Sequence, residues 1–197
     1  MRVMTDDWDA HAATFDDEPD HGLRDADVRA AWAALLMPFL PAAPATVLDL
    51  GCGTGTLSVL LAERGYRVRG LDSSARMLAA ARAKAVGAGV PVDLVRGDAS
   101  NPPFEPASAD VVLCRHVLWA LDDPAAAVAA WVRLLRPGGR LLLVEGSWST
   151  GGGLPADVCR DLVLTHRTTA VVRDLAPDAA LWGRPVDDER YLLHSPA

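Results

Sequence analysis

The most constraining feature of this sequence is a short apolar run, residues 46–50, that leads directly into three glycines at alternate positions, Gly51, Gly53 and Gly55. A helical pattern follows the glycines. A buried strand, a glycine turn and a helix in succession point unpaired backbone N–H groups at a ligand, because glycine permits sharp turns and close approach. The sequence therefore predicts nucleotide-site geometry at the carboxyl end of this strand.

Two well-known nucleotide loops do not fit the spacing of these glycines. A dinucleotide-binding loop has the pattern G-x-G-x-x-G, but the third position is Thr56 when counted from Gly51 and Ser58 when counted from Gly53. A phosphate-binding Walker loop would require Gly-Lys-Ser/Thr, which does not follow here. Neither of these two classes of nucleotide site is predicted.

Apolar runs of strand type alternate with helical patterns along the rest of the chain. We expect strands at 46–50, 67–71, 92–96, 110–115 and 140–145, with helices after the first glycines, at about 74–85, from 124 and at about 155–166. The expected N-caps are Ser73 or Ser74 and Asp123, Trp131 is expected on the buried face of its helix, and residues 137–139 are expected to form the turn into the fifth strand. Two further β-like runs, 168–174 and 189–194, have no helix between them and should form an antiparallel hairpin at one edge. The expected fold is α/β, a single doubly wound, mostly parallel sheet of seven strands.

The N-terminal region carries an apolar stripe at helical spacing, from Val28 to Phe39. We expect residues 1–40 to form a helical lid. Residues 41–197 would then form the Rossmann-like core of one domain. Residues 30–48 contain no charge, but Pro38, Pro41 and Pro44 interrupt them, which predicts helix, loop and strand rather than a membrane span.

Composition narrows the function further. The chain has 197 residues, enough for one domain, and 26 acidic against 19 basic side chains give a net charge of −7, which disfavours a nucleic-acid partner. The three cysteines are far apart and lack zinc-ligand spacing, so no disulfide framework and no metal site is expected. No apolar signal segment opens the chain, and we expect a cytoplasmic protein without a membrane partner. The sequence does not indicate an oligomeric state.

Five stretches resemble, in order, the motifs of class I S-adenosylmethionine-dependent methyltransferases. Residues 49–55, Asp-Leu-Gly-Cys-Gly-Thr-Gly, are similar to the first motif of that family, and the other stretches are 71–73, 97–99, 110–116 and 134–140. The resemblance covers roughly residues 8–194. It implies a Rossmann-like fold, S-adenosylmethionine as cofactor with S-adenosylhomocysteine as product, and transfer of the methyl group by in-line displacement.

The resemblance also implies roles for particular residues. Asp72 matches the acidic residue that binds both ribose hydroxyls, Asp98 is placed to accept a hydrogen bond from the adenine amine, and residues 110–116 resemble the motif lining the methyl-transfer site. The cofactor contacts implied in this way are Asp49, Gly51, Cys52, Gly53, Asp72, Ser73, Met77, Asp98, Ala99, Cys114 and Arg115.

Physical reasoning supports the assignment of Asp72 independently. It follows Gly51 by about 20 residues, which puts a carboxylate at the carboxyl end of the neighbouring strand, where a ribose diol would sit. A lone Asp before a helix can also be a simple N-cap, but the glycine loop upstream favours the cofactor interpretation.

The stretch Asn101-Pro102-Pro103-Phe104 looks like the catalytic motif of enzymes that methylate amino groups of DNA bases or glutamine side chains. In those enzymes the motif follows the fourth strand. Here it precedes that strand, so we interpret it as a turn whose prolines fix the backbone.

His116 and His21 are the candidate catalytic residues, because imidazole titrates near neutral pH and can accept a proton from an attacking atom. Either histidine could instead form a hydrogen bond that only stabilises the fold. Trp119 and Trp148 could line an acceptor pocket, although large aromatic residues are more often core. Cys52 and Cys114 are interpreted as small apolar side chains that fill space in the core, rather than as nucleophiles.

The chain has no room for a large inserted cap, so its lid is short and predicts a small acceptor, a metabolite or a natural-product intermediate. The sequence does not select O, N or C as the methylated atom. An alternative that keeps the same cofactor residues is an S-adenosylmethionine-binding protein with a non-methylating activity or a partner role.

Overall fold

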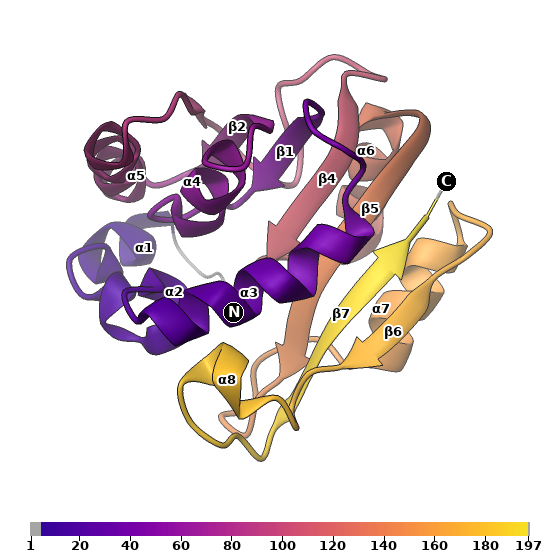
Figure 1. Ribbon diagram of the computed structural model, residues 1–197. Coiled ribbons are helices and arrows are strands. Elements are labelled where there is room, and N and C mark those ends of the chain that lie inside the picture. The colour runs from indigo at the N-terminus through magenta and orange to yellow at the C-terminus, as the bar shows by residue number, and fades with distance from the viewer. Residues whose placement is uncertain (1–4, 197) are drawn as a thin grey trace.

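The computed structural model describes the backbone of residues 5–196 and the side chains of residues 8–196. It contains one seven-stranded sheet in the order β3-β2-β1-β4-β5-β7-β6 (Figure 1). The strands are β1 (Thr46–Leu50), β2 (Arg67–Asp72), β3 (Asp93–Arg96), β4 (Ala109–Arg115), β5 (Leu135–Ser147), β6 (Val171–Asp174) and β7 (Glu189–Ser195). Neighbours among β1 to β5 pair in parallel, whereas β7 is antiparallel to both β5 and β6. The direction of strand order reverses between β1 and β4, which makes that edge the switch point where α/β proteins bind ligands.

Helices cover both faces of this sheet. They are α1 (Thr5–His11), α2 (Pro19–Gly22), α3 (Ala26–Leu36), α4 (Thr56–Ala62), α5 (Ala75–Ala88), α6 (Pro124–Leu134), α7 (Ala156–Leu164) and α8 (Ala179–Trp182), with short 3-10 turns at Phe15–Asp17, Met37–Phe39 and Leu118–Ala120. Because strand side chains alternate, Val47 packs with Trp32 of α3 on one face, and Leu48 packs with Trp131 of α6 on the other. Two apolar clusters therefore hold the helices to the sheet.

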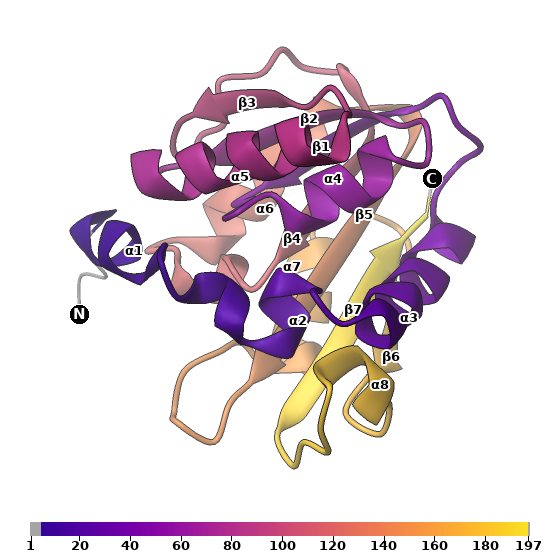
Figure 2. The same cartoon turned by 60° about the vertical axis from the view of Figure 1, so that its left-hand side comes forward.

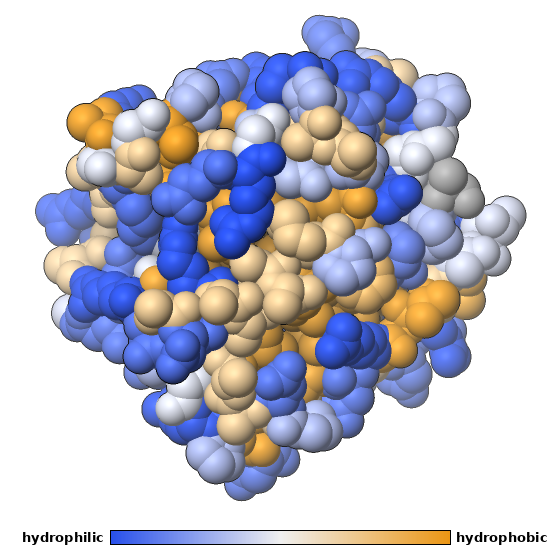
Figure 3. Space-filling view, viewed as in Figure 1, coloured by the Kyte–Doolittle hydropathy of each residue, from blue (hydrophilic) through white to orange (hydrophobic). Residues whose placement is uncertain are grey.

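Helix α3 buries its large residues and presents small ones. Trp32 and Leu36 are fully buried, while Ala30 and Ala34 are exposed. Figure 3 shows a pale orange band of weakly hydrophobic residues across the middle of the face seen in Figure 1. The apolar stripe predicted from the sequence is therefore the buried side of this helix.

The predicted fold class is confirmed: a mostly parallel seven-stranded sheet with a C-terminal antiparallel hairpin. The predicted caps are also observed, since Ser74 Oγ accepts from the N–H of Met77 and Asp123 accepts from the N–H of Ala126. The uncharged segment 30–48 is helix, loop and strand. No helix among the described residues is long and apolar enough to span a membrane.

Two details differ from the sequence-based expectation. Strand β5 begins at Leu135, which pairs with Ala109, and continues through the expected turn at 137–139 after a shift of register. The hairpin connection contains the short helix α8, whose Trp182 is buried against α3. Turn residues such as Pro and Gly predicted a break at 137–139, but pairing with β4 keeps the backbone extended on both sides of it.

The N-terminal segment crosses the carboxyl ends of the parallel strands. In Figure 2, α1 and α2 lie below α5 and α4, and α2 contacts both α3 and α8. Residues 1–4 of the expected lid lie outside the described residues, as does Ala197 of the expected core. The visible part of the segment is placed where it can cover a ligand bound at the switch point.

Candidate active site

The glycine loop after β1 has a backbone that only glycine accommodates well. Gly51, Gly53 and Gly55 have φ angles of 74°, 54° and 75°. A Cβ on Gly51 would lie 2.2 Å from Cγ2 of Val117. The N–H of Gly51 donates to the carbonyl oxygen of Leu71 at 2.7 Å, which ties the loop to β2. The loop is thus a close-approach surface at the end of β1, and a nucleoside-containing cofactor fits it.

Asp72 ends β2 beside this loop. Its Oδ2 accepts from the N–H of Gly53 at 2.8 Å, and its Oδ1 accepts from the N–H of Ser74 at 2.9 Å. Burial raises the pKa of the Asp72 carboxyl above its usual value, and the hydrogen bonds from backbone N–H groups oppose that rise. The side chain lines the cavity described next, so its oxygens are available to a diol.

One cavity of about 1100 Å³ runs from the glycine loop to the N-terminal segment. Its wall contains both predicted catalytic histidines and all but one of the predicted cofactor residues. Those in the wall are His21, His116, Asp49, Gly51, Cys52, Gly53, Asp72, Ser73, Met77, Asp98, Ala99 and Arg115. Residues from several distant stretches of sequence therefore meet around one space.

Cys114 is the residue that lies outside this wall. It is fully buried in the cluster beneath α6, and burial raises the pKa of its thiol well above 9.0. Successive side chains of a strand point to opposite faces, so Cys114 points into the core while Arg115 borders the cavity. The apolar-filler interpretation of this cysteine agrees with its position.

The loop after β3 forms another part of the wall. Asp98 accepts from the N–H and the hydroxyl of Ser100 at 2.8 and 2.7 Å. The carbonyl oxygen of Ala99 accepts from Nε1 of Trp131 at 2.7 Å. Sequence reasoning placed Trp131 on the buried face of its helix but did not reveal that it fixes this loop.

Asn101 is exposed and lies outside the cavity wall. It sits in a turn in which the N–H of Phe104 donates to the carbonyl oxygen of Pro102 at 2.9 Å. The stretch comes after β3 and before β4, as the sequence predicted. It therefore forms a turn between β3 and β4 rather than part of the loop that follows β4.

Two acidic side chains join the N-terminal segment to the glycine loop and to α5. Asp9 of α1 accepts from the hydroxyl of Ser74, which is itself the N-cap of α5. Asp16 accepts from the hydroxyl of Thr54 and forms an ion pair with Lys84 at 2.9 Å. The segment is thereby held over the glycine loop from both sides.

Aromatic rings surround the end of the cavity beneath this segment. Phe15 stacks on His21 with ring centroids 4.3 Å apart. His116 meets Trp148 edge-on at 5.4 Å, and Trp119 meets Trp148 at 5.1 Å. These side chains line the cavity, so the two tryptophans belong to its wall rather than to the core alone.

His116 has an unusual backbone, with a φ of 59° in the left-handed region. Glu145 of β5 supports it, because its Oε1 accepts from the N–H groups of Val117 and Leu118 at 3.0 and 2.7 Å. Glu145 is fully buried, and burial raises the pKa of its carboxyl to about 8. A buried acid thus fixes the loop that carries the histidine.

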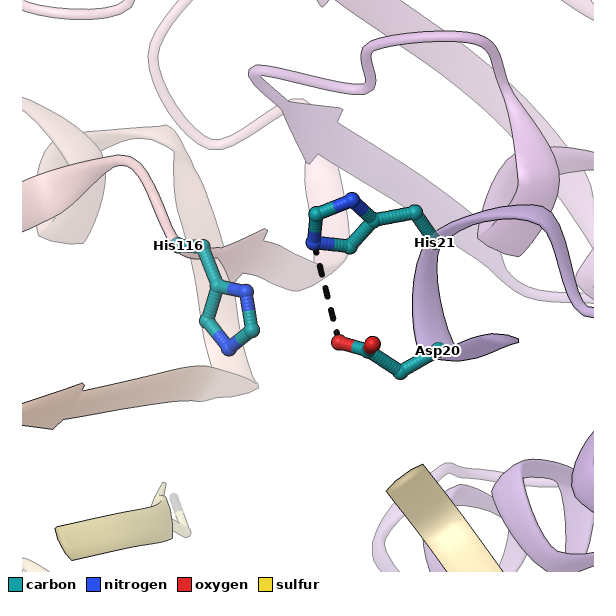
Figure 4. Close-up of side chains that lie close together, drawn as sticks. All are labelled: Asp20, His21 and His116. Atoms are coloured by element: carbon teal, nitrogen blue, oxygen red, sulfur yellow. Dashed lines mark ion pairs between the residues drawn. The ribbon is translucent and has the colours of Figure 1, made fainter. Parts of the chain in front are cut away.

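Both histidines favour the neutral form. Burial lowers the pKa of His21, with Asp20 opposing that shift, and burial lowers the pKa of His116 well below its usual value of 6.5. Figure 4 shows the two rings with the carboxylate of Asp20 between α2 and the loop after β4. Neutral imidazole carries a free ring lone pair, which can accept a proton or bind a metal.

Sequence reasoning missed three residues that shape this site: Asp20, Lys84 and Glu145. Asp20 was visible only as part of an acidic run, and Lys84 carried no signal. Glu145 did carry one, since it is a single acid within an apolar strand, and such an acid must find hydrogen-bond donors inside the fold.

Comparison with known proteins agrees with this geometry. Residues 48–143 match the family model described as a methyltransferase domain. The ubiquinone biosynthesis O-methyltransferase of Pseudomonas paraeruginosa is 42% identical over 99 residues, which are 50% of this chain and 43% of that protein. The chain spans about half the length of the curated relatives it matches.

Two solved structures share the fold. The [4+2]-cyclase SpnF has a TM-score of 0.72 at 19% identity and covers 84% of this chain and 79% of its own. A putative S-adenosyl-L-methionine-dependent methyltransferase of Methanococcus maripaludis has a TM-score of 0.61 at 26% identity, over 68% of this chain and 62% of its own. With the matched family model, the sheet order and the glycine loop, these findings assign the class: the chain contains, over residues 48–143, a methyltransferase domain of the class I S-adenosylmethionine-dependent type. Its cofactor is therefore S-adenosylmethionine.

Proposed function

We propose that this protein transfers the methyl group of S-adenosylmethionine to a small-molecule acceptor, a metabolite or a natural-product intermediate. One observation carries the proposal: a single cavity joins the glycine loop and Asp72 to the aromatic and histidine-lined end beneath the N-terminal segment. Its volume of about 1100 Å³ exceeds the range of roughly 300–1,000 Å³ usual for one small ligand. Cofactor and acceptor can therefore share one continuous cavity.

The chain's own residues would hold the cofactor at the glycine end. Asp72 would accept hydrogen bonds from the ribose hydroxyls, the loop at Gly51 and Gly53 would allow close approach of the amino-acid part, and Asp98 would accept from the adenine amine. When bound, S-adenosylmethionine supplies a methyl group on a positively charged sulfur, which is a strong electrophile. The protein's task is then to align an acceptor with that group and to exclude water.

The aromatic end would hold the acceptor. His116 and His21 project into it and would take the proton that the attacking atom releases, because each favours the neutral form. Trp119 and Trp148 would confine a small, largely apolar body against them. The N-terminal segment, held by Asp9 and Asp16, would close the site.

The atom that receives the methyl group is proposed to be an oxygen. The named function of the Pseudomonas relative, an O-methyltransferase of ubiquinone biosynthesis, supports an oxygen acceptor. The cavity itself accommodates O, N or C acceptors of small size.

A second candidate function is a non-methylating use of the same cofactor pocket. It is favoured by the likeness to a solved structure named as a [4+2]-cyclase, which has this fold. Both candidates need the glycine loop and Asp72, so cofactor binding does not separate them.

Turnover does separate them. We would incubate the purified protein with S-adenosylmethionine labelled on the methyl group and a cell extract, then separate small molecules, proteins and nucleic acids. Label in a small molecule, absent with the Asp72→Ala variant, is the expected result. Label confined to protein or nucleic acid contradicts the proposed acceptor class, and binding of cofactor with no labelled product contradicts methyl transfer.

A further inference from the structure

Three side chains with metal-ligating atoms converge at the acceptor end of the cavity. Asp20 and His21 come from α2, and His116 comes from the loop after β4 (Figure 4). One ligand atom from each lies within 4.8 Å of the other two, and His21 Nε2 lies 3.6 Å from Asp20 Oδ2. Asp20 and His21 are adjacent, but His116 is distant from both in the sequence, so no local ligand spacing could reveal the cluster.

The donor set and the separations suit a divalent transition metal. Two imidazoles and one carboxylate are ligands that Zn²⁺ and its neighbours accept, at about 2.0–2.2 Å from the ion. Around a tetrahedral ion such bonds place ligand atoms roughly 3.3–3.6 Å apart. The pair from α2 already has this separation at 3.6 Å, and the ligand atom of His116 lies within 4.8 Å of both.

The surroundings hold these ligands in place and leave the carboxylate available. Phe15 stacks on the ring of His21, and Glu145 fixes the backbone beside His116. Arg115, the cation beside the cluster, donates to the main-chain oxygen of Asp20 rather than to its carboxylate. Among the described residues, that carboxylate has one ion-pair partner, His21.

The other two arginines of the cavity wall are already paired with acids. Arg184 forms an ion pair with Glu18 at 3.1 Å, and Arg190 forms one with Asp188 at 2.7 Å. They therefore do not occupy the cluster as counter-ions. In addition, His116 Nε2 is buried without a hydrogen-bond partner among the described residues. A buried polar atom without a partner is uncommon in native proteins, so this ring is not already committed to a hydrogen bond within the fold through that nitrogen.

We propose that Asp20, His21 and His116 form a binding site for one divalent transition metal ion, such as Zn²⁺, with an open coordination position toward the cavity. Three protein ligands with an open fourth position are the arrangement of catalytic rather than structural zinc sites.

The catalytic consequence rests on the proposed function. An acceptor hydroxyl at the open position would release its proton to water more readily, because the ion stabilises the oxygen anion. That oxygen would form the new bond to the methyl carbon, while the sulfur keeps the electron pair of the bond that breaks. In this arrangement the histidines act through the metal, and the acceptor is an oxygen compound.

Metal binding can be measured without any acceptor or turnover. We would titrate Zn²⁺ into the metal-free, tag-free full chain by calorimetry and record the visible spectrum with Co²⁺ as a second probe. The variants are His21→Gln, His116→Gln and Asp20→Asn. The matched control is His166→Gln, because His166 is exposed just after the end of α7 and does not line the cavity. Cofactor affinity, measured in the same samples, reports whether each variant is folded.

We expect one ion per chain, and each ligand variant should lose more than the roughly ten- to hundredfold in affinity typical of removing an outer partner. The control should bind as the unchanged protein does. The inference is overturned if the unchanged chain binds neither ion in the micromolar range, if folded ligand variants keep full affinity, or if Co²⁺ shows sulfur-to-metal absorption, which would move the site to a cysteine such as Cys52. Because methyl transfer is not the readout, failure here leaves the proposed function standing.

Discussion

The two ends of the cavity are built in different ways. At the cofactor end, the glycine loop, Asp72 and Asp98 lie at or within two residues of the ends of three consecutive strands, so their positions are set by the sheet itself. At the acceptor end, His21, His116 and Trp148 come from a short helix, an irregular loop and the residue after β5, and His21 joins the other two only because the N-terminal segment folds over the sheet. Local sequence thus determines one end, and long-range packing determines the other.

The sharpest way to break this comparison is to remove the N-terminal segment. We expect deletion of residues 1–22 to abolish turnover, since Phe15, Asp20 and His21 leave the acceptor end, while Asp72 and the sheet remain. Circular dichroism should show a folded protein, and calorimetry should show weakened but measurable cofactor binding. Turnover near the full-length rate in the truncated chain would mean that the acceptor is held elsewhere.

The support beneath His116 can be tested through pH. Burial raises the pKa of Glu145 to about 8 in the folded state from 4.5, so the folded state holds the proton more tightly than the unfolded chain. Its contribution to stability is therefore fully present below pH 4.5 and is lost as pH rises through about 8. Gln keeps an oxygen for the N–H groups of Val117 and Leu118 but cannot ionise.

We compare the free energy of unfolding of Glu145→Gln with that of the unchanged protein. We expect the difference to shift in favour of the variant as pH rises from 4.5 to about 8. At about 1.4 kcal/mol for each unit of pKa shift, the shift from 4.5 to about 8 sets an upper limit on the gain of about 5 kcal/mol. Urea unfolding at several pH values measures it. Parallel stability curves for the two proteins would show that Glu145 is ionised, or solvated, in the folded state.

The cofactor end should respond to a single local change. Asp72→Ala should weaken S-adenosylmethionine binding by roughly ten- to a hundredfold, because a charged partner of two hydroxyls is worth about 1.5–3 kcal/mol. Asp93→Ala is a matched control, since Asp93 is exposed in a surface ion pair with Arg69. Equal affinities of the two variants by calorimetry would show that the ribose site is misplaced.

The smallest effect should come from Asn101. It is exposed in a turn outside the cavity, so Asn101→Ala should leave the methyl-transfer rate constant within a few-fold. Arg115→Ala, by contrast, alters a cavity residue and should reduce the rate. A selective collapse of kcat in the Asn101 variant, with cofactor affinity intact, would place the reacting atoms near β3 rather than β4.

The same contrast explains what could be predicted from the sequence. Strand and helix periodicity located the sheet, and the caps Ser74 and Asp123 were readable because their partners lie within one helical turn. Asp72 was readable because a parallel strand places its last residue at a known edge. The roles of Asp20 and Lys84 could not be predicted. Each depends on a contact with a residue on another element, His116 for Asp20 and Asp16 for Lys84, and no local sequence pattern indicates such a contact.

The C-terminal hairpin has a consequence for how the chain reaches this structure during synthesis. Strand β7 (Glu189–Ser195) lies between β5 and β6, although both of those strands precede it in the sequence. As the polypeptide emerges from the ribosome, the edge of β5 stays open and β6 has no strand to pair with until residues 189–195 appear. The nascent chain therefore exposes two unsatisfied backbone edges, and the sheet closes in one late event. A protein synthesised in this order depends on rapid completion, or on a chaperone, to keep β5 from pairing with a neighbouring chain.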